Sequence, residues 1–526
     1  MPATPIMNVL FITADQWRGE CLSCLGHLVQ TPNLDKLAAQ GVHFSKHFAQ
    51  ATPCSPSRAS IHTGMYQMNH RVCTNGSPLS ERFTNMALEA RAHGYNPQLF
   101  GYTDTALDPN SATTTDKDTQ TYETPLPGYE VTQALTEKPL PWMQWLREKG
   151  YQVPSEHDFM ALYRPASSGP EYGASYGAAP YGREHTETAF LREKLEQYIS
   201  AQGDAPWFAH LSWLRPHPPF IAPAPYNTMY DPADVAPPIR HSSLTQQRAE
   251  HPYLDYVLSQ KLSAPSSYNV ADGRGLKPDM SELDLRQMRA TYYGMMSEVD
   301  HQLGLLLAFL DERKLTDNTL IIFSSDHGEQ LGDHYLLDKQ GFYDQSYHIP
   351  LIIRPPGRAW DSCRGRRVEQ FTQNIDLMPT VLDFIGTAQP RQCDGHSLKA
   401  FMQAQTPSNW RTEVYWEHDF RDILTGAPEQ RFGLNLEECS LAVVRDHKYK
   451  YVHFNRLPAL LFDLEHDPHE LHNLISHPEH TGTALHYAQK MLDWRLRNAE
   501  RSLSHWHYSE SGPHRASPER NRTYKR

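Results

Sequence analysis

Asn8-Val-Leu-Phe-Ile-Thr13, which runs directly into Ala14 and Asp15, is the stretch that decides the fold of this chain. A short, continuous apolar run of this kind predicts a strand buried within a parallel sheet. Thr319-Leu-Ile-Ile-Phe-Ser324 repeats the pattern and leads into Asp326 and His327. Since the carboxyl ends of parallel strands open into a common crevice, we expect the polar residues after both runs to gather there.

Further strands and helices alternate along the chain, which predicts an α/β fold with a large, mainly parallel sheet flanked by helices. Strands are predicted at 208–213 and 350–354, and helices at 32–41, from Arg58 onward after the Cys54 loop, at 284–313 and at 374–386. Thr31 is the predicted N-cap of the first helix, with Pro32 at its first position. Strands at 440–444, 449–453 and 459–463 and a helix at 482–501 predict a smaller antiparallel sheet with a helix.

These elements divide the 526-residue chain into a main α/β domain at 1–386, a smaller α+β subdomain at 387–501 and a tail at 502–526. The region from about 105 to 285 is rich in Pro, Gly, Tyr and Ser, so we expect long insertions that wall a site. The tail holds Trp506, Tyr508 and Tyr524 among charges. It is either a contact between subunits or a disordered end.

Composition excludes several classes of protein. A formal net charge of −12 argues against a dedicated nucleic-acid binder. The 7 cysteines are scattered and odd in number, unlike a disulfide framework. The N-terminus lacks the basic region of a signal peptide, and no stretch approaches the roughly 20 apolar residues of a membrane span. We therefore expect a soluble, cytoplasmic protein with neither a nucleic-acid nor a membrane partner.

The two strand ends together offer ligands for one divalent cation. Asp15 and Gln16 end one strand, and Asp326 and His327 end another. Carboxylate oxygens and an imidazole suit calcium, manganese or magnesium, and the sequence does not distinguish these ions. Taken singly, an Asp after a strand is also explained as a turn former or helix cap.

Cys54 lies in Thr52-Pro-Cys-Ser-Pro-Ser-Arg58, whose core has the form Cys-x-Pro-x-Arg. This stretch resembles the signal by which sulfatases have a cysteine oxidised to formylglycine after translation. A thiol is a poor match for attack on sulfate or phosphate esters. A hydrated aldehyde has two hydroxyls on one carbon, so one attacks and the other later collapses to expel the product. Joined to this motif, the metal interpretation of the strand ends becomes the favoured one.

Nearly the whole chain resembles the sulfatase branch of the alkaline phosphatase superfamily. Within that branch it is most similar to bacterial phosphonate monoester hydrolases, which also hydrolyse phosphodiesters and sulfate monoesters. Besides the highly specific Cys54 motif, the matching stretches are Asn8–Trp17, Thr31–Leu37, Met68–Arg71, Arg215–Phe220, Ser325–His334 and Phe462–Glu470. The resemblance implies an alkaline-phosphatase-like sandwich, one divalent metal ion and formylglycine made from Cys54 by a modifying enzyme. It also implies a homotetramer in which C-terminal extensions embrace neighbouring subunits.

The resemblance further implies roles for individual residues. Asp15, Cys54 in its modified form, Asp326 and His327 bind the metal, with Gln16 beside it. Many sulfatases carry a second Asp at position 16 and an Asn at position 327, so the residues found here match the phosphonate hydrolase branch. Arg58 would hold the hydrate, Asn75 and Tyr102 would contact non-bridging oxygens of the substrate, and His217 and Lys339 would face the transferred group and the leaving oxygen.

Each of these residues also has a plainer interpretation. Taken alone, Lys339 is also explained as a solvated surface lysine, and His217 as a histidine that caps a Pro-rich turn. Tyr102 is also explained as a side chain that only packs in the wall of the site. Asn75 with Gly76 is also explained as a common turn pair. Arg58 is also explained as a residue that serves only in the signal for the modifying enzyme.

Two features depart from the phosphonate hydrolase pattern. Position 104 is Asp, where a neutral hydroxyl residue is expected. A carboxylate there would disfavour substrates with two charges or coordinate another group. Ser57 precedes Arg58, the commoner sulfatase spelling, whereas phosphonate hydrolases often carry Ala. Both features favour sulfate esters.

The predicted reaction is a two-step displacement at sulfur or phosphorus in a small anionic ester. The hydrate attacks in line, and the resulting ester then breaks its C–O bond and regenerates the aldehyde. Sulfate monoesters, phosphonate monoesters and phosphodiesters all present an oxyanion with one charge. The alternatives are a dedicated sulfatase of the arylsulfatase or choline-sulfatase kind, a two-metal phosphomutase or nucleotide pyrophosphatase, and an inactive binding protein on the same scaffold.

Overall fold

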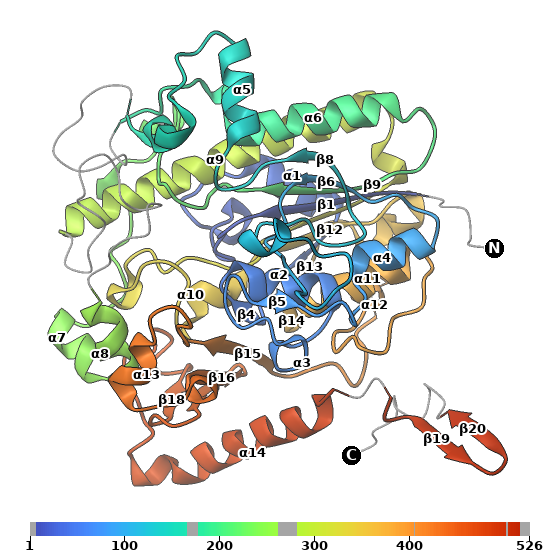
Figure 1. The fold of residues 1–526 in the computed structure, drawn as a ribbon. Coiled ribbons are helices and arrows are strands. Elements are labelled where there is room, and N and C mark those ends of the chain that lie inside the picture. Colours follow the sequence, from blue (N-terminus) through green and yellow to red (C-terminus); the bar gives the residue numbers. More distant parts are fainter. Residues whose placement is uncertain (1–6, 166–176, 261–280, 404, 501–502, 516–526) are drawn as a thin grey trace.

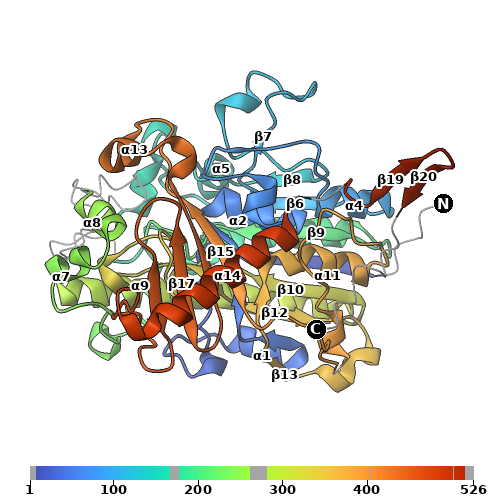
Figure 2. The ribbon, with the colours of Figure 1, turned by 90° about the horizontal axis from the view of Figure 1, so that it is seen from below.

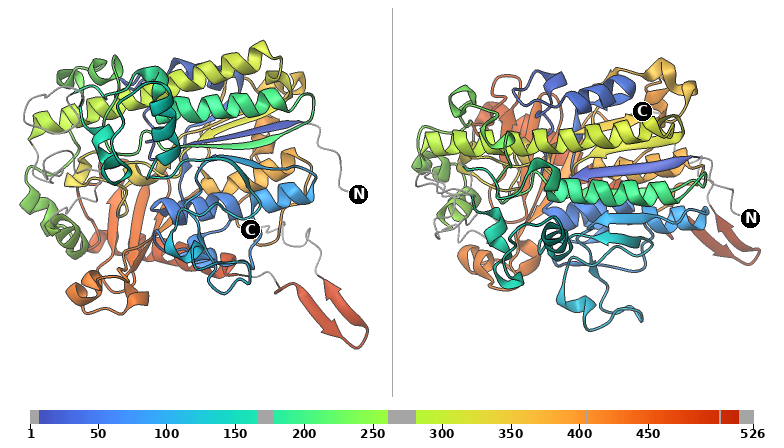
Figure 3. Two further views of the ribbon diagram at one scale, coloured as in Figure 1. Left: turned by 45° about the horizontal axis from the view of Figure 1, so that its top comes forward. Right: turned by 90° about the horizontal axis from the view of Figure 1, so that it is seen from above.

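The computed structural model describes residues 7–165, 177–260, 281–403, 405–500 and 503–515. Parts of the predicted insertions and the end of the tail, including Tyr524, lie outside the described residues. An eight-stranded sheet lies between two layers of helices (Figures 1 and 3). Its strand order is β13 (Arg366–Val368), β2 (Val42–Phe44), β12 (Leu351–Arg354), β10 (Thr319–Ser324), β1 (Asn8–Ala14), β9 (Phe208–Trp213), β6 (Gln98–Gly101) and β8 (Glu130–Ala134).

The sheet is mainly parallel, as the apolar runs predict. β1 pairs in parallel with β10 on one side and with β9 on the other. β6 runs parallel to β9 and β8, whereas β12 is antiparallel to both β10 and β2. All seven residues of β1 are buried, because helices cover both faces of the sheet.

Alternate residues of β1 enter different cores. Leu10 and Ile12 pack in one cluster with helices α1 (Pro32–Gln40), α5 (Leu140–Glu148), α6 (Glu187–Ala201) and α9 (Glu282–Glu312). Val9 and Phe11 pack on the other face with α2 (Cys54–Thr63), α4 (Met86–Ala92), α11 (Leu377–Phe384) and α12 (Lys399–Met402). This alternation is the period-two geometry of a strand between two helical layers.

A second sheet of five strands, four of them from the C-terminal part of the chain, lies below the first in Figure 1. Its order is β18 (Leu460–Asp463), β17 (Tyr449–Phe454), β16 (Ser440–Arg445), β15 (Val414–Asp419) and β4 (Ala51–Thr52). The first four are antiparallel neighbours, and α14 (Thr481–Asn498) packs on the outside of this sheet (Figure 2). β4 joins β15 in parallel, so the segment just before Cys54 is an edge strand of the C-terminal sheet.

The remaining short elements connect these layers. They are α3 (Gln67–His70), α7 (Leu244–Ala249), α8 (Pro252–Ser259), α10 (Asp344–Tyr347), α13 (Ala427–Phe432), the small sheet of β11 (His348–Ile349), β3 (His47–Phe48) and β14 (Thr372–Gln373), and the pair β5 (Pro78–Leu79) and β7 (Ala106–Leu107). Within the tail, β19 (Trp506–Ser509) and β20 (Gly512–Arg515) form a hairpin that stands apart from the body in Figure 1. The divisions predicted at residues 386 and 501 stay predictions.

The structure corrects two local predictions. The second helix begins at Cys54 and not at Arg58, so the motif forms the first turn and a half of α2. Thr31 occupies the N-cap position of α1 with Pro32 after it, as predicted, but its side chain makes no cap hydrogen bond. Asp300 of α9 instead accepts hydrogen bonds from the backbone N–H groups of Asn33 and Leu34, at 3.1 and 2.8 Å. A side chain distant in sequence therefore accepts hydrogen bonds from the first N–H groups of α1, and the local sequence gives no sign of this contact.

Candidate active site

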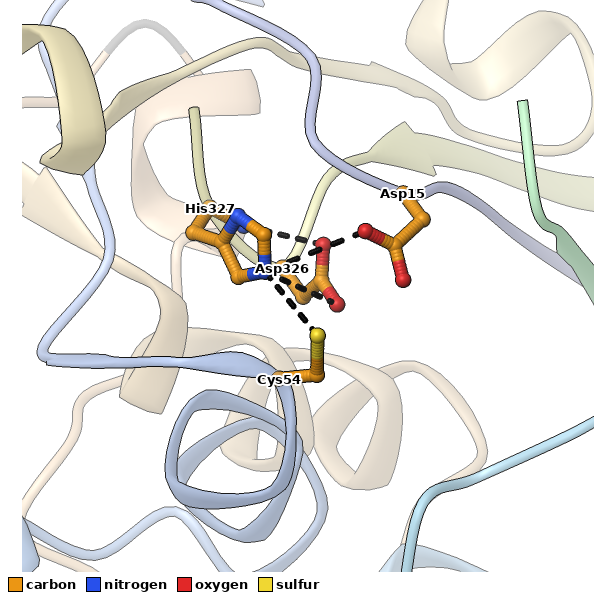
Figure 4. Close-up of side chains that lie close together, drawn as sticks. All are labelled: Asp15, Cys54, Asp326 and His327. Carbon is orange, nitrogen blue, oxygen red and sulfur yellow. Dashed lines mark hydrogen bonds and ion pairs between the residues drawn. The ribbon is translucent and has the colours of Figure 1, made fainter. Parts of the chain in front are cut away.

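Three elements bring the predicted metal ligands together (Figure 4). Asp15 follows β1, and Asp326 and His327 follow β10, two strands paired side by side with Thr13 opposite Ser324. Cys54 stands at the first position of α2. One ligand atom from each of these four buried side chains lies within 4.8 Å of the others. The polar residues that follow the two apolar runs therefore gather at the carboxyl ends of the strands, as predicted.

The imidazole of His327 lies close to the other three side chains of the cluster. His327 Nε2 lies 3.2 Å from Cys54 Sγ and 3.8 Å from Asp15 Oδ1. It also lies 3.8 Å from Asp326 Oδ2. Asp15 Oδ1 is buried and accepts no hydrogen bond from any described residue. A buried carboxylate oxygen without a donor, facing an imidazole and a second carboxylate, fits a divalent cation.

Arg58 of α2 joins the two strand ends. Its Nε donates to Asp326 Oδ2 at 2.9 Å, and its Nη2 donates to Asp15 Oδ2 at 3.0 Å. Nη1 donates to Ser212 Oγ at 2.9 Å, which ties the guanidinium to β9 as well. All five N–H directions of a guanidinium are fixed in one plane, so these contacts determine where both carboxylates lie.

Tyr102 lies against Arg58, and its hydroxyl donates to Asp15 Oδ2. The guanidinium carbon is 4.2 Å from the centre of the Tyr102 ring. In this structure Tyr102 thus supports Asp15 and Arg58 directly, in addition to walling the site. Asp104 approaches the same guanidinium, with its Oδ2 3.8 Å from Arg58 Nε. The Asp104 backbone has a φ of 47°, a left-handed conformation that is uncommon for residues other than glycine.

Burial and charge act in opposite directions on the acidic groups. Burial alone raises the pKa of the Asp15 carboxyl, but surrounding basic groups hold it well below its usual range. In order of effect these groups are His217, Arg58, His327 and Lys339. Burial raises the pKa of the Cys54 thiol well above its usual range, and Asp15 raises it further. The unmodified thiol is therefore neutral and poorly suited to attack an ester.

Lys339 and Gln16 form a buried chain next to the cluster. Lys339 Nζ donates to Gln16 Oε1 at 2.9 Å, and Gln16 Nε2 donates to Glu329 Oε2. Glu329 also accepts backbone N–H groups of Leu331 and Asp338, at 3.0 and 2.6 Å. Lys339 is thus buried at the site and is not the solvated lysine of the plainer interpretation.

Asn75 and His217 each make a close contact with the backbone of a neighbouring loop or helix. The backbone N–H of Ser55 donates to Asn75 Oδ1 at 2.9 Å, so Asn75 caps the first turn of α2 beside Cys54. His217 is buried, and its Nδ1 lies 2.7 Å from the carbonyl oxygen of Pro218. A carbonyl only accepts, so this contact places the proton of a neutral ring on Nδ1 and leaves Nε2 as the basic nitrogen.

Sequence reasoning missed three residues that hold the site. Ser212 binds Arg58, and Glu329 binds Gln16, as described above. Ser57 Oγ donates to the Asp326 carbonyl oxygen at 2.5 Å and accepts from Asn374 Nδ2 at 2.9 Å. Ser57 and Glu329 lie inside the motifs that carry the resemblance, so the sequence could have indicated them. Ser212 lies outside these motifs, in β9, where it shares the strand with His210 and nothing local distinguishes it.

Comparison with known proteins identifies the family. The sulfatase family model matches residues 7–387. The chain belongs to the sulfatase family. A model for the C-terminal part of N-sulphoglucosamine sulphohydrolase also matches residues 332–497. Membership makes the chain a hydrolytic enzyme and implies a metal ion and a formylglycine modification, for which the donor set around Cys54 is suited.

Several relatives match over almost their full length. The multifunctional alkaline phosphatase superfamily protein PehA of Trinickia caryophylli is 40% identical, with 96% of this chain and 98% of that protein covered. An arylsulfatase of Clostridium perfringens is 28% identical, with 94% and 95% covered. The crystal structure of the phosphonate monoester hydrolase of Agrobacterium radiobacter has a TM-score of 0.92 and 45% identity, with 97% of this chain and 100% of that one covered.

We predict that a divalent cation stabilises the folded protein through this cluster. Adding the ion at about 100 times its dissociation constant to chelator-treated protein should stabilise it by about 2.7 kcal/mol, seen as a higher thermal unfolding midpoint. Asp15→Asn should lose most of this shift, because the amide removes one anionic ligand. Asp116→Asn, on the exposed surface, is the matched control and should keep it. An equal shift in both variants would contradict the assignment.

Proposed function

We propose that the chain is a metal-dependent hydrolase that uses formylglycine made from Cys54 to cleave phosphonate monoesters and phosphodiesters, with sulfatase activity on sulfate monoesters. The convergence of Asp15, Cys54, Asp326 and His327 within 4.8 Å is the observation that carries this proposal. The likeness to the Agrobacterium phosphonate monoester hydrolase, at 45% identity over 97% of this chain, supports the substrate class.

One metal ion, calcium, manganese or magnesium, would be held by Asp15, Asp326, His327 and the modified Cys54, with Gln16 beside it. Bound there, it supplies a Lewis acid that lowers the pKa of the hydrate hydroxyl and stabilises charge on the transferred group. Oxygen-rich ligands around a hard cation fit each of these three ions. Among the described residues, one cluster of His, Cys, Asp and Glu meets the spacing of a metal site, which supports the one-metal enzyme over the two-metal alternative.

The other residues would orient the ester and handle its charge. Arg58 holds both strand ends and neutralises Asp15 and Asp326, so that an anion can approach. The N-terminus of α2, with Asn75 beside it, points partial positive charge at the same place. His217 and Lys339 would face the leaving oxygen as it develops negative charge, and His217 would give a proton to it from Nε2.

We predict that Cys54→Ala lowers turnover of both an aryl sulfate and an aryl phenylphosphonate by roughly 10³-fold or more, since removing a nucleophile leaves only binding and electrostatic contributions. The protein should come from a host that supplies the modifying enzyme. The wild-type peptide containing residue 54 should carry the mass of an aldehyde in place of a thiol. Cys24→Ala, at an exposed cysteine, is the control and should retain full activity. Retention of most activity by Cys54→Ala would rule out the covalent route.

A dedicated sulfatase is the second candidate, and Asp104 is the observation that favours it. Arg58 already pairs with two carboxylates, and Asp104 adds a third at 3.8 Å. Burial raises the pKa of Asp104 well above its usual range, although Arg58 opposes this shift. When ionised, the Asp104 carboxylate reduces the attraction of Arg58 for a substrate with two charges.

We predict that Asp104→Thr changes selectivity between singly and doubly charged esters. The ratio of kcat/KM for an aryl phosphate to that for an aryl sulfate should rise roughly tenfold, which corresponds to about 1.4 kcal/mol. The rise should be larger at higher pH, where more of Asp104 is ionised in the wild type. Glu81→Gln, at an exposed acid, should leave the ratio unchanged. An unchanged ratio in Asp104→Thr would show that this carboxyl does not select substrates.

Exposed apolar residues of α14 and of the tail support the proposal of a homotetramer. Trp506 and Tyr508 of the hairpin are 40% and 77% exposed, and Leu485, Leu492 and Leu496 are exposed along α14. Exposed apolar side chains on the hairpin and on the outer face of α14 suit a subunit contact. The cysteines support the proposal of a cytoplasmic location. All seven are among the described residues and all are free, which suits a reducing compartment. None of the described helices is both long enough and apolar enough to span a bilayer.

We predict that light scattering will give the mass of four chains, and that removal of residues 500–526 will give a smaller assembly, because it deletes the exposed hairpin. The ratio of activities toward sulfate and phosphonate esters should stay constant in the truncated chain. A full-length monomer, or a truncated tetramer, would contradict this role of the tail.

A further inference from the structure

The loop that carries His217 has few backbone donors of its own. Arg215-Pro-His-Pro-Pro219 contains three prolines, and proline has no N–H group. The His217 N–H is used within the loop, donating to the Leu214 carbonyl oxygen at 2.9 Å. Buried carbonyl groups in such a segment need donors from elsewhere.

Arg215 supplies these donors. Its Nη1 donates to the carbonyl oxygens of His217 and Pro219, at 2.7 and 3.1 Å. Its Nη2 donates to Glu187 Oε2 at 2.6 Å. Arg215 and Glu187 are only 5% and 3% exposed, so the ion pair is shielded from water and holds one geometry.

Glu187 is fixed in turn by its surroundings. It lies in the first turn of α6, which packs against β9 and α9. The Tyr163 hydroxyl donates to Glu187 Oε1 at 2.7 Å, so both carboxylate oxygens have a partner. The Tyr163 ring also lies against the guanidinium, 5.0 Å from its carbon to the ring centre. The loop is therefore tied through Arg215 to a rigid helix outside the site.

We propose that Glu187 and Arg215 are a positioning pair that sets the place of His217 at the leaving-group side of the site. Within the described part of the chain, neither side chain makes a hydrogen bond or ion pair with the four-residue cluster. The pair acts through the two loop carbonyls that Arg215 binds. With Nδ1 turned to Pro218, the direction of Nε2 depends on where this backbone lies. The inference rests on the proposed function, which gives His217 its role with the leaving oxygen.

The test compares Glu187→Gln, His217→Ala and the double variant on aryl sulfates with good and poor leaving groups. Glu187→Gln should lower kcat by roughly 10²-fold for the poor leaving group, the scale expected when a catalytic group is misplaced by about 1 Å. KM and the rate for the good leaving group should change much less. In the His217→Ala background, Glu187→Gln should have little further effect, because both changes remove the same help.

A second measurement does not depend on activity. Hydrogen exchange of the amides at 214–222 should be faster in Glu187→Gln than in the wild type, with exchange in β9 unchanged. Glu187→Gln also leaves a buried arginine unpaired, so if this variant does not fold, Glu187→Gln combined with Arg215→Gln removes both charges and serves in its place. Glu196→Gln is the matched control, because it breaks the Arg192–Glu196 pair on the same helix, at 2.5 Å, away from the loop.

The outcomes separate this inference from the proposed function. Additive losses in the double variant, equal losses for both leaving groups, or unchanged exchange at 214–222 would overturn the positioning pair while the hydrolase assignment stands. A wild-type chain that cleaves none of the esters would overturn the proposed function, and the exchange measurement would still decide whether Glu187 holds the loop.

Discussion

Parallel pairing of β1 with β10 is the constraint on which the site depends. The register that sets Thr13 opposite Ser324 carries Asp15 and Asp326 to the same edge of the sheet, although they are distant in sequence. Helices cover both faces of these strands, so neither can shift by one residue without moving its apolar side chains into the wrong core. The hydrophobic packing of the sheet thereby fixes the spacing of the polar groups at its edge.

Arg58 stabilises the two buried carboxylates, Asp15 and Asp326, at this edge of the sheet. Two buried carboxylates close together repel each other, and burying each of them costs free energy. The guanidinium donates to both and is itself held by Ser212, so three strands and α2 meet at one cation. The same contacts leave Asp15 Oδ1 without a hydrogen-bond donor among the described residues and aimed at the imidazole, which is the geometry that suits a metal ligand.

The C-terminal sheet contributes to the position of Cys54. β4 pairs with β15 directly before the motif, and Gln50 Nε2 donates to Glu417 Oε2 at 3.0 Å in the same pairing. Arg495 of α14 donates to the other oxygen of Glu417, at 2.7 Å. The second sheet is therefore a support for the start of α2 as well as a separate packing unit.

The sequence by itself determined the class of fold, the meeting of Asp15 with Asp326 and His327, and the motif around Cys54. Apolar runs and short motifs are local patterns, and residues within a few positions of one another carry them. The tertiary structure alone decided that Asp300 caps α1, that β4 joins the second sheet, that Ser212 and Glu329 hold Arg58 and Gln16, and that Glu187 anchors the His217 loop. These contacts join side chains far apart in the chain, and their geometry depends on how whole layers pack, which no local pattern records.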